Sequence, residues 1–221
     1  MKGIGEFFRG ERAEAVKAWI SRNRSNILWG FAAVVLGVAF LAYTQRGRAG
    51  RPKGQWEYVQ AVYLMSTGDT ARALPALQDL YQKFPNTKWG KRALYYLGYH
   101  YYTVGDMTKA EEFWTRFLSS KPGDPFTEAN ALSGMASIRM NQERYEEAER
   151  FLSEAISKAP YETYRAFYTY RKAMCLEISG KPSEALKLYR EIKEKYPKTP
   201  SAVESEARIR FLEAYIAAGG G

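Results

Sequence analysis

The sequence has one cysteine, Cys175, and one histidine, His100, among its 221 residues. A single cysteine excludes an internal disulfide and any metal site built from several cysteines. A lone histidine with no cluster of cysteines or carboxylates beside it is typical of a packed or surface ring rather than of a base or a ligand. The sequence also lacks a phosphate-binding glycine loop, a His-Glu-x-x-His motif and a nucleophile elbow. We therefore predict a protein that is not an enzyme, with no cofactor, metal or small-molecule substrate.

Most of the chain carries little net charge. The formal net charge is +9, but residues 1–53 hold ten Lys and Arg against three Glu, whereas residues 54–221 hold 23 against 21 acidic residues. A nucleic-acid-binding domain needs its basic residues on the folded body, and here they flank an apolar run instead. This distribution favours contact with a membrane surface and argues against nucleic acid as a partner.

One stretch, from Asn26 to Gln45, has no charged residue at all. Its 20 residues would cover about 30 Å as an α-helix, which is the thickness of the hydrocarbon core of a bilayer. Trp29 and Tyr43 lie near its two ends, where aromatic residues anchor membrane helices. A cleaved signal peptide is the alternative, but the run is longer than usual and no small-x-small cleavage site follows it. The sequence therefore predicts a retained transmembrane helix at residues 26–45.

Small residues gather on one side of this predicted span, at Gly30, Ala33 and Gly37. Such a face lets two membrane helices approach closely, and it is also ordinary content of a membrane helix. Both interpretations stay open, so a homo-oligomer and a membrane-embedded partner protein are both compatible with the sequence.

The two segments that flank the predicted span are basic. Residues 1–25 become helical and amphipathic from Glu11, which is typical of a helix in the headgroup layer or of an extension of the membrane helix. Residues 46–54 contain three glycines and a proline, so we predict a linker without a stable helix. Near the span, the basic residues number five on one side and four on the other, so charge leaves the membrane orientation undecided.

Four similar units follow each other over residues 55–197. Small residues recur in register, with steps of 37, 38 and 37 residues: Ala61, Gly98, Ala136 and Ala173 in one series, and Ala73, Ala110, Ala148 and Ala185 in another. A proline closes each unit at Pro85, Pro122, Pro160 and Pro197. Apolar residues at helical spacing on both sides of a central turn predict two antiparallel helices per unit, in contact at the small residues. The four units cover about residues 55–85, 91–122, 126–160 and 164–197, and residues 198–221 form a polar capping helix and a glycine tail.

This pattern resembles the tetratricopeptide repeat (TPR) family, in which helix hairpins of about 34 residues stack into a solenoid. The resemblance implies an all-α fold, an α-solenoid of four hairpins, with three or four additional residues per unit. The sequence from Phe84 to Gly98 is similar to the sequences of bacterial envelope TPR proteins, such as those of outer-membrane β-barrel assembly. Residues 14–19, followed by the apolar run and a TPR body, resemble the YfgM-type ancillary subunit of the bacterial Sec translocon. That resemblance implies a single-pass protein of the bacterial inner membrane with its TPR domain in the periplasm.

The first helices of TPR stacks line an inner groove, so the resemblance also implies which residues contact a partner protein. These residues occupy four recurring positions: Tyr58, Val62, Met65, Arg92, Tyr95, Tyr99, Tyr102, Asn130, Ser133, Ser137, Met140, Phe167, Tyr170 and Met174. The set is rich in tyrosine and methionine, which suits apolar or extended protein segments. It lacks the lysine and asparagine clamp with which chaperone-binding TPR domains hold a terminal carboxylate. Packing of some of these tyrosines between helices is the alternative.

We expect a non-catalytic adaptor at the bacterial inner membrane, whose groove binds a partner protein or an emerging unfolded chain. Two alternatives stay open. One is a scaffold subunit of a large envelope assembly, such as a motor or a secretion machine, that packs laterally through its repeats. The other is a receptor of opposite orientation, with its repeats in the cytosol.

Overall fold

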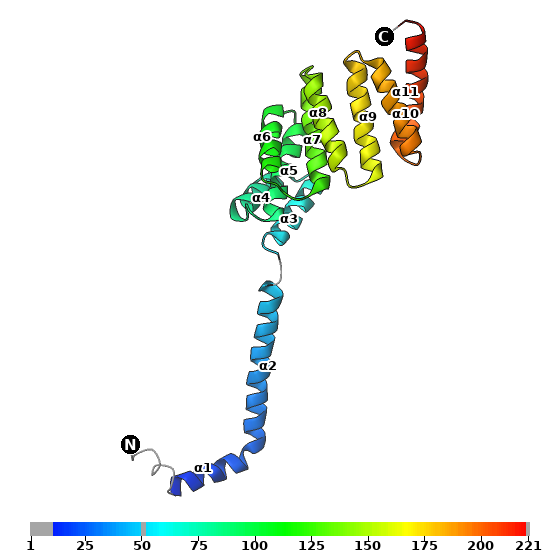
Figure 1. Cartoon of the computed structure of the whole chain (residues 1–221). Helices are drawn as coiled ribbons and strands as arrows, with labels where there is room; N and C mark the ends of the chain where they lie inside the picture. The colour runs from blue at the N-terminus through cyan, green and yellow to red at the C-terminus, as the bar shows by residue number, and fades with distance from the viewer. Residues whose placement is uncertain (1–10, 50–51, 220–221) are drawn as a thin grey trace, which may run out of the picture. The chain divides into compact units, whose positions relative to one another are not determined.

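The computed structural model of the chain describes residues 11–49 and 52–219, with the side chains of residues 11–15, 27–28, 31–32 and 43–49 outside the description. Over these residues the chain forms eleven helices and no strand (Figure 1). The prediction of an all-α fold is therefore confirmed. The chain divides into two compact units, Met1–Pro52 and Lys53–Gly221, and each is described by itself.

The first unit contains α1 (Glu11–Arg22) and α2 (Arg24–Ala49). The second of these helices covers residues 26–45 and continues to Ala49, four residues into the segment where we expected a linker. A single glycine such as Gly47 disfavours a helix by only about 1 kcal/mol, which does not stop a helix that the preceding residues already propagate. Among the residues that the structure describes, no helix combines the length and the apolarity needed to cross a membrane.

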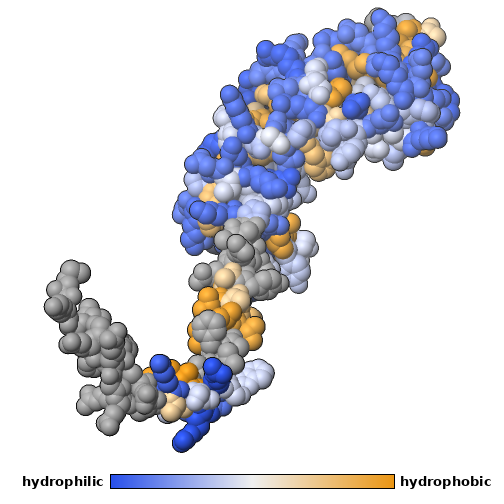
Figure 2. All heavy atoms as spheres, turned by 60° about the horizontal axis from the view of Figure 1, so that its bottom comes forward, coloured by the Kyte–Doolittle hydropathy of each residue, from blue (hydrophilic) through white to orange (hydrophobic). Residues whose placement is uncertain are grey.

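Large apolar side chains of the first unit are exposed. Trp29, Leu36 and Phe40 on α2 are exposed, as are Val16 and Trp19 on α1. Figure 2 shows hydrophobic residues along the described part of α2, in contrast with the mostly hydrophilic surface of the second unit. Gly30 and Gly37 have no neighbouring side chain where a Cβ would lie, and Ala33 is exposed. The side chain of Tyr43 lies outside the described residues.

The second unit is a stack of four helix hairpins and a final helix. The hairpins are α3 (Gln55–Ser66) with α4 (Thr70–Lys83), α5 (Lys88–Thr103) with α6 (Met107–Ser119), α7 (Pro125–Asn141) with α8 (Tyr145–Lys158), and α9 (Glu162–Ile178) with α10 (Pro182–Lys195). The final helix is α11 (Pro200–Ala217). Each second helix packs on the first helix of its own hairpin and on the first helix of the next, so the stack is continuous (Figure 1).

The repeated small residues lie at the helix contacts, as the sequence predicts. All eight are buried: Ala61, Ala73, Gly98, Ala110, Ala136, Ala148, Ala173 and Ala185. Four residues after each second-helix alanine, a large side chain fills the space between the helices: Leu77, Trp114, Leu152 and Tyr189, none of them more than 2% exposed. Small and large residues therefore interlock with the same period along the whole stack, which buries apolar surface in every hairpin.

The turns within the hairpins also repeat, with one exception. Gly68, Gly105 and Gly180 have backbone φ angles of 79°, 85° and 79°, in the left-handed region that glycine adopts without strain. The equivalent residue of the third hairpin is Glu143, with a φ of 59°. Its turn makes the same backbone hydrogen bonds as the others, since the amides of Arg144 and Asp106 donate to equivalent carbonyls at 2.9 Å.

Candidate protein-binding face

We define the first-helix face as the surface formed by the helices that open the hairpins, α3, α5, α7 and α9, together with α11. The residues expected there differ in exposure. Tyr99, Phe167 and Met174 are exposed, to 48%, 44% and 37%. Ser133 and Ser137 are buried. The others are partly buried: Tyr58, Val62, Met65, Arg92, Tyr95, Tyr102, Asn130, Met140 and Tyr170.

Three tyrosines of α3 and α5 form a connected aromatic cluster with Trp89. The ring centroid of Tyr58 lies 4.9 Å from that of Trp89 and 5.9 Å from that of Tyr96, and Tyr95 lies 5.2 Å from Tyr96. Tyr95 also packs on Phe117 of α6, 5.7 Å away. Burial raises the pKa values of the Tyr58 and Tyr95 hydroxyls above the ordinary 10.0. Tyr95 therefore contributes to packing between helices, whereas Tyr99, one turn further along α5, is open to a partner.

Arg92 lies over this cluster. Its guanidinium carbon is 5.5 Å from the ring centroid of Trp89 and 5.9 Å from that of Tyr58, and its Nε donates a hydrogen bond to Asp124. Burial acts to lower the pKa of Arg92, but the hydrogen bond to Asp124 leaves it raised. The charge of Arg92 is therefore already matched within the protein.

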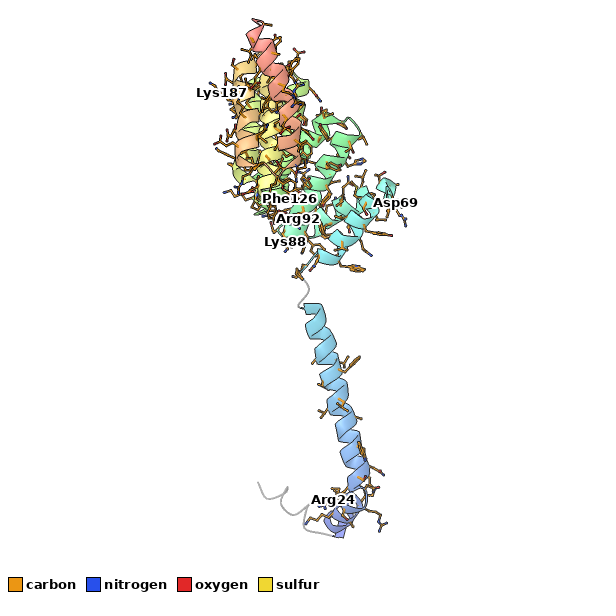
Figure 3. All side chains as sticks on the ribbon, turned by 90° about the vertical axis from the view of Figure 1, so that its right-hand side faces the viewer. Arg24, Asp69, Lys88, Arg92, Phe126 and Lys187 are labelled. Carbon is orange, nitrogen blue, oxygen red and sulfur yellow. The ribbon has the colours of Figure 1, made fainter. Side chains whose placement is uncertain are left out.

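An open pocket of about 390 Å³ lies beside Arg92 at the start of the first helices. Its lining comprises Arg92, Asp124, Pro125, Phe126, Pro160, Tyr161 and Tyr164. Figure 3 shows Arg92 between Lys88 and Phe126. The aromatic residues here were missed in the sequence, although Trp89, Phe126 and Tyr164 recur in phase, with steps of 37 and 38 residues. That period was the signal that could have found them.

The contact between α7 and α9 depends on polar side chains. Nη1 of Arg171 donates to the main-chain oxygen of Ser133 at 3.0 Å, and the guanidinium also donates to the hydroxyls of Ser133 and Ser137. The hydroxyl of Tyr168 donates to Oδ1 of Asn130 at 2.9 Å. Ser133 and Ser137 are thus covered by Arg171, which no sequence motif singled out.

The final helix extends the first-helix face. Val62, Tyr99, Ser137, Met174 and Phe211 follow each other with steps of 37, 38, 37 and 37 residues. Phe211 of α11 is 55% exposed, and its ring stacks on that of Tyr215, which is also exposed. We expected a polar cap, but α11 is polar only in part, because Phe211 adds a third exposed apolar side chain to Tyr99 and Met174 at this position.

Neither His100 nor Cys175 belongs to a reactive cluster. Within the described ranges, no group of three or more His, Cys, Asp or Glu side chains could hold a metal ion. The thiol of Cys175 is buried, and its sulfur lies 3.6 Å from the main-chain oxygen of Tyr145. Burial raises the pKa of this thiol to about 11, which disfavours the reactive thiolate.

Comparison with known structures finds the same fold in several helical repeat proteins. The chain matches MamA at 20% identity with a TM-score of 0.56, over 72% of this chain and 84% of that one. It matches YrrB, a TPR protein with an unusual peptide-binding site, at 15% identity with a TM-score of 0.57, over 80% and 84%. It matches PilF of Pseudomonas aeruginosa at 21% identity with a TM-score of 0.55, over 76% and 77%. A search of curated proteins finds no match.

A family model described as a tetratricopeptide repeat-like domain matches residues 17–206. The match includes all four hairpins and the first part of α11. The buried small residues, the interlocking large ones and the turns repeat with the period of these hairpins. The chain therefore belongs to the tetratricopeptide repeat-like family.

Proposed function

We propose that this protein is a non-catalytic adaptor, and that its first-helix face binds an extended segment of a partner protein. The observation that carries the proposal is the series of exposed apolar side chains at one recurring position, Tyr99, Met174 and Phe211. Exposed large apolar side chains at a recurring position of a repeat stack typically mark an interaction surface, because each one loses unfavourable contact with water when it is covered. TPR domains bind protein partners, and the peptide-binding site described for YrrB is in keeping with a peptide ligand here.

We also propose that residues 26–45 tether the protein to the bacterial inner membrane, with the repeats in the periplasm. Support for the tether comes from the sequence: an uncharged run of 20 residues with arginines just outside both ends. Exposed apolar side chains along the described part of α2 agree with it. A tether would raise the local concentration of the binding face near membrane partners, so that weak contacts suffice.

Co-purification from membranes tests the adaptor function. Tyr99→Ala and Phe211→Ala should each lower the recovery of partner protein about fivefold or more, as expected for exposed aromatic anchors of an interface. Tyr63→Ala is the matched control, because Tyr63 is an exposed tyrosine of α3 that lies outside the recurring position. Equal recovery with all three variants would contradict the proposal. A stoichiometric ring or stack of this chain alone on native gels would favour the scaffold alternative instead.

Protease treatment of spheroplasts tests the tether and the orientation together. The proposal expects the protein in the membrane fraction after alkaline extraction, with the repeats digested by external protease. Repeats that stay protected until the inner membrane is broken would support the cytosol-facing receptor. Release of the intact chain by alkaline extraction would contradict the tether.

A further inference from the structure

Within the part of the chain that the structure describes, no carboxylate pairs with the positive charge of Arg171. Its guanidinium makes three hydrogen bonds, and all three acceptors are neutral oxygens of Ser133 and Ser137. The titratable groups that interact with it are two tyrosines and a cysteine, Tyr102, Tyr168 and Cys175, and none of them is a carboxylate. Burial lowers its pKa from the ordinary 12.5, yet an arginine stays charged under all physiological conditions.

Three arginines of the second unit that are not fully exposed pair with carboxylates, whereas Arg171 and Arg165, whose Nε donates to the main-chain oxygen of Ala159, do not. Arg92 pairs with Asp124, Arg139 pairs with Glu111 and Glu147, and Arg208 pairs with Glu177. The pKa of each of these three is raised by its carboxylates, although burial opposes the rise. Among the residues that the structure describes, no carboxylate forms such a pair with Arg171. A charge held out of water without a counter-charge is unfavourable, and a carboxylate from outside would relieve it.

Arg171 contacts the middle member of the recurring position that carries the proposed function. It covers Ser137, whose equivalents in the other hairpins and in α11 are Val62, Tyr99, Met174 and Phe211. The first-helix face is therefore apolar on α5, cationic where α9 reaches α7, and apolar again on α9 and α11. The carbon atom of the guanidinium also lies 5.9 Å from the ring of Phe167, which is exposed.

We propose that the first-helix face recognises a partner segment in which an acidic side chain lies between two apolar residues, with Arg171 pairing with the carboxylate. This inference rests on the proposed function. Charge complementarity selects the acid, and the exposed side chains on both sides of Arg171 select its apolar neighbours. The same arrangement argues for an acidic residue within a segment rather than for a terminal carboxylate. A chain that ended at Arg171 would leave either Tyr99 or Phe211 uncovered.

A selection from random peptides tests the inference without knowledge of the partner. The full-length protein in mild detergent is presented with short peptides displayed between two linkers, so that no peptide terminus is free. The expected result is enrichment of Asp or Glu flanked on both sides by apolar residues. Enrichment of apolar residues without an acid would overturn this inference and leave the proposed function standing. No enrichment at all would overturn both.

A pair of synthetic peptides then tests the role of Arg171. The selected sequence, acetylated and amidated, is compared with its Glu→Gln or Asp→Asn counterpart by fluorescence anisotropy. We expect the neutral peptide to bind the unaltered protein about tenfold more weakly. With Arg171→Gln the two peptides should bind equally, and Arg171→Lys should restore part of the difference. Arg150→Gln, an exposed arginine of α8, is the control and should leave the tenfold difference intact.

Two results would overturn the role of Arg171. One is equal binding of both peptides to the unaltered protein, which needs no variant and so does not depend on the folding of Arg171→Gln. The other is tight binding only of peptides with a free terminal carboxylate, which would assign the charge to a chain end.

Discussion

The indole ring of Trp114 lies where a side chain at Gly98 would have to be. A Cβ at Gly98 would lie 2.5 Å from Cδ1 of the indole, and a Cβ at Gly134 of α7 would overlap the far side of the same ring. Trp114 is thus enclosed between α5 and α7, and its Nε1 donates a hydrogen bond to the main-chain oxygen of Tyr95 at 3.2 Å. One side chain of α6 therefore joins the second hairpin to the third.

Gly98→Ala should destabilise the protein, because the added methyl group overlaps a ring that is enclosed on both sides. We expect a loss of about 1–3 kcal/mol in the free energy of unfolding, measured by urea denaturation. Ser153→Ala, at an exposed position of α8, is the control and should change little. In a Trp114→Leu background the effect of Gly98→Ala should shrink, and an unchanged effect there would show that the indole is not the cause.

Glu143→Gly should stabilise the protein. The left-handed conformation disfavours a residue with a Cβ by about 1–2 kcal/mol, and the greater freedom of glycine in the unfolded chain offsets about half of this gain. A net increase of about 0.5–1 kcal/mol is therefore expected in urea denaturation. Gly105→Ala, at the equivalent turn, should have the opposite sign. Destabilisation by Glu143→Gly would mean that contacts of the glutamate side chain stabilise the fold by more than its left-handed backbone conformation destabilises it.

The ion pair between Glu111 and Arg139 should make stability depend on pH. The hydrogen bond from Arg139 lowers the pKa of Glu111 below its ordinary 4.5. A carboxyl whose pKa is lower in the folded state stabilises that state above its unfolded pKa, and the contribution is lost as the pH falls through the folded pKa. Glu111→Gln should therefore lower stability by about 1 kcal/mol at pH 7 and by much less at pH 3.

Glu112→Gln is the matched control for this prediction. Glu112 pairs with Arg116 on the same helix, and its side chain is 59% exposed. Its removal should change the unfolding free energy little at either pH. Equal pH dependence in the Glu111→Gln variant and the unaltered protein would show that the inter-hairpin pair does not contribute.

Alanine substitutions of Tyr95 and Tyr99 should have different effects, the first on stability and the second on partner binding. Tyr95→Ala removes a ring packed on Phe117 and Tyr96, so we expect a loss of about 2–3 kcal/mol in unfolding free energy. Tyr99→Ala should lower stability by less than about 0.5 kcal/mol, as at other exposed positions, yet weaken partner binding. Thermal melting and co-purification of both variants check this. A large melting loss for Tyr99→Ala would assign that residue to the core.

The repeated hairpins could be predicted because their signal is local and occurs four times in register. Gly98 and Ala110 are small because two helices are in contact there, and each of the other hairpins needs small residues at the same two positions. Side-chain contacts between neighbouring hairpins could not be predicted in the same way. Arg171 contacts Ser133, 38 residues earlier in the chain, and the small residues and prolines that mark the repeats do not identify that pair. The sequence also could not separate Tyr95 from Tyr99, because one turn of helix places both on the same side.

The end of α2 was misplaced for a different reason. Glycine lowers helix propensity without preventing a helix, whereas our prediction treated Gly47, like Pro52, as a residue that excludes one. The series through Phe211 was missed because a pair of helices defined each predicted repeat, and no second helix follows α11 within the residues described up to 219.

Photo-crosslinking tests the central claim most directly. A photoreactive phenylalanine analogue replaces Tyr99 on the first-helix face or, as a control, Glu154 at an exposed position of α8. The adaptor account predicts a discrete crosslinked partner protein from position 99 in intact cells, none from position 154, and loss of the product when Phe211 is also changed to alanine. Crosslinks of equal yield from both positions, or none from position 99, would contradict it.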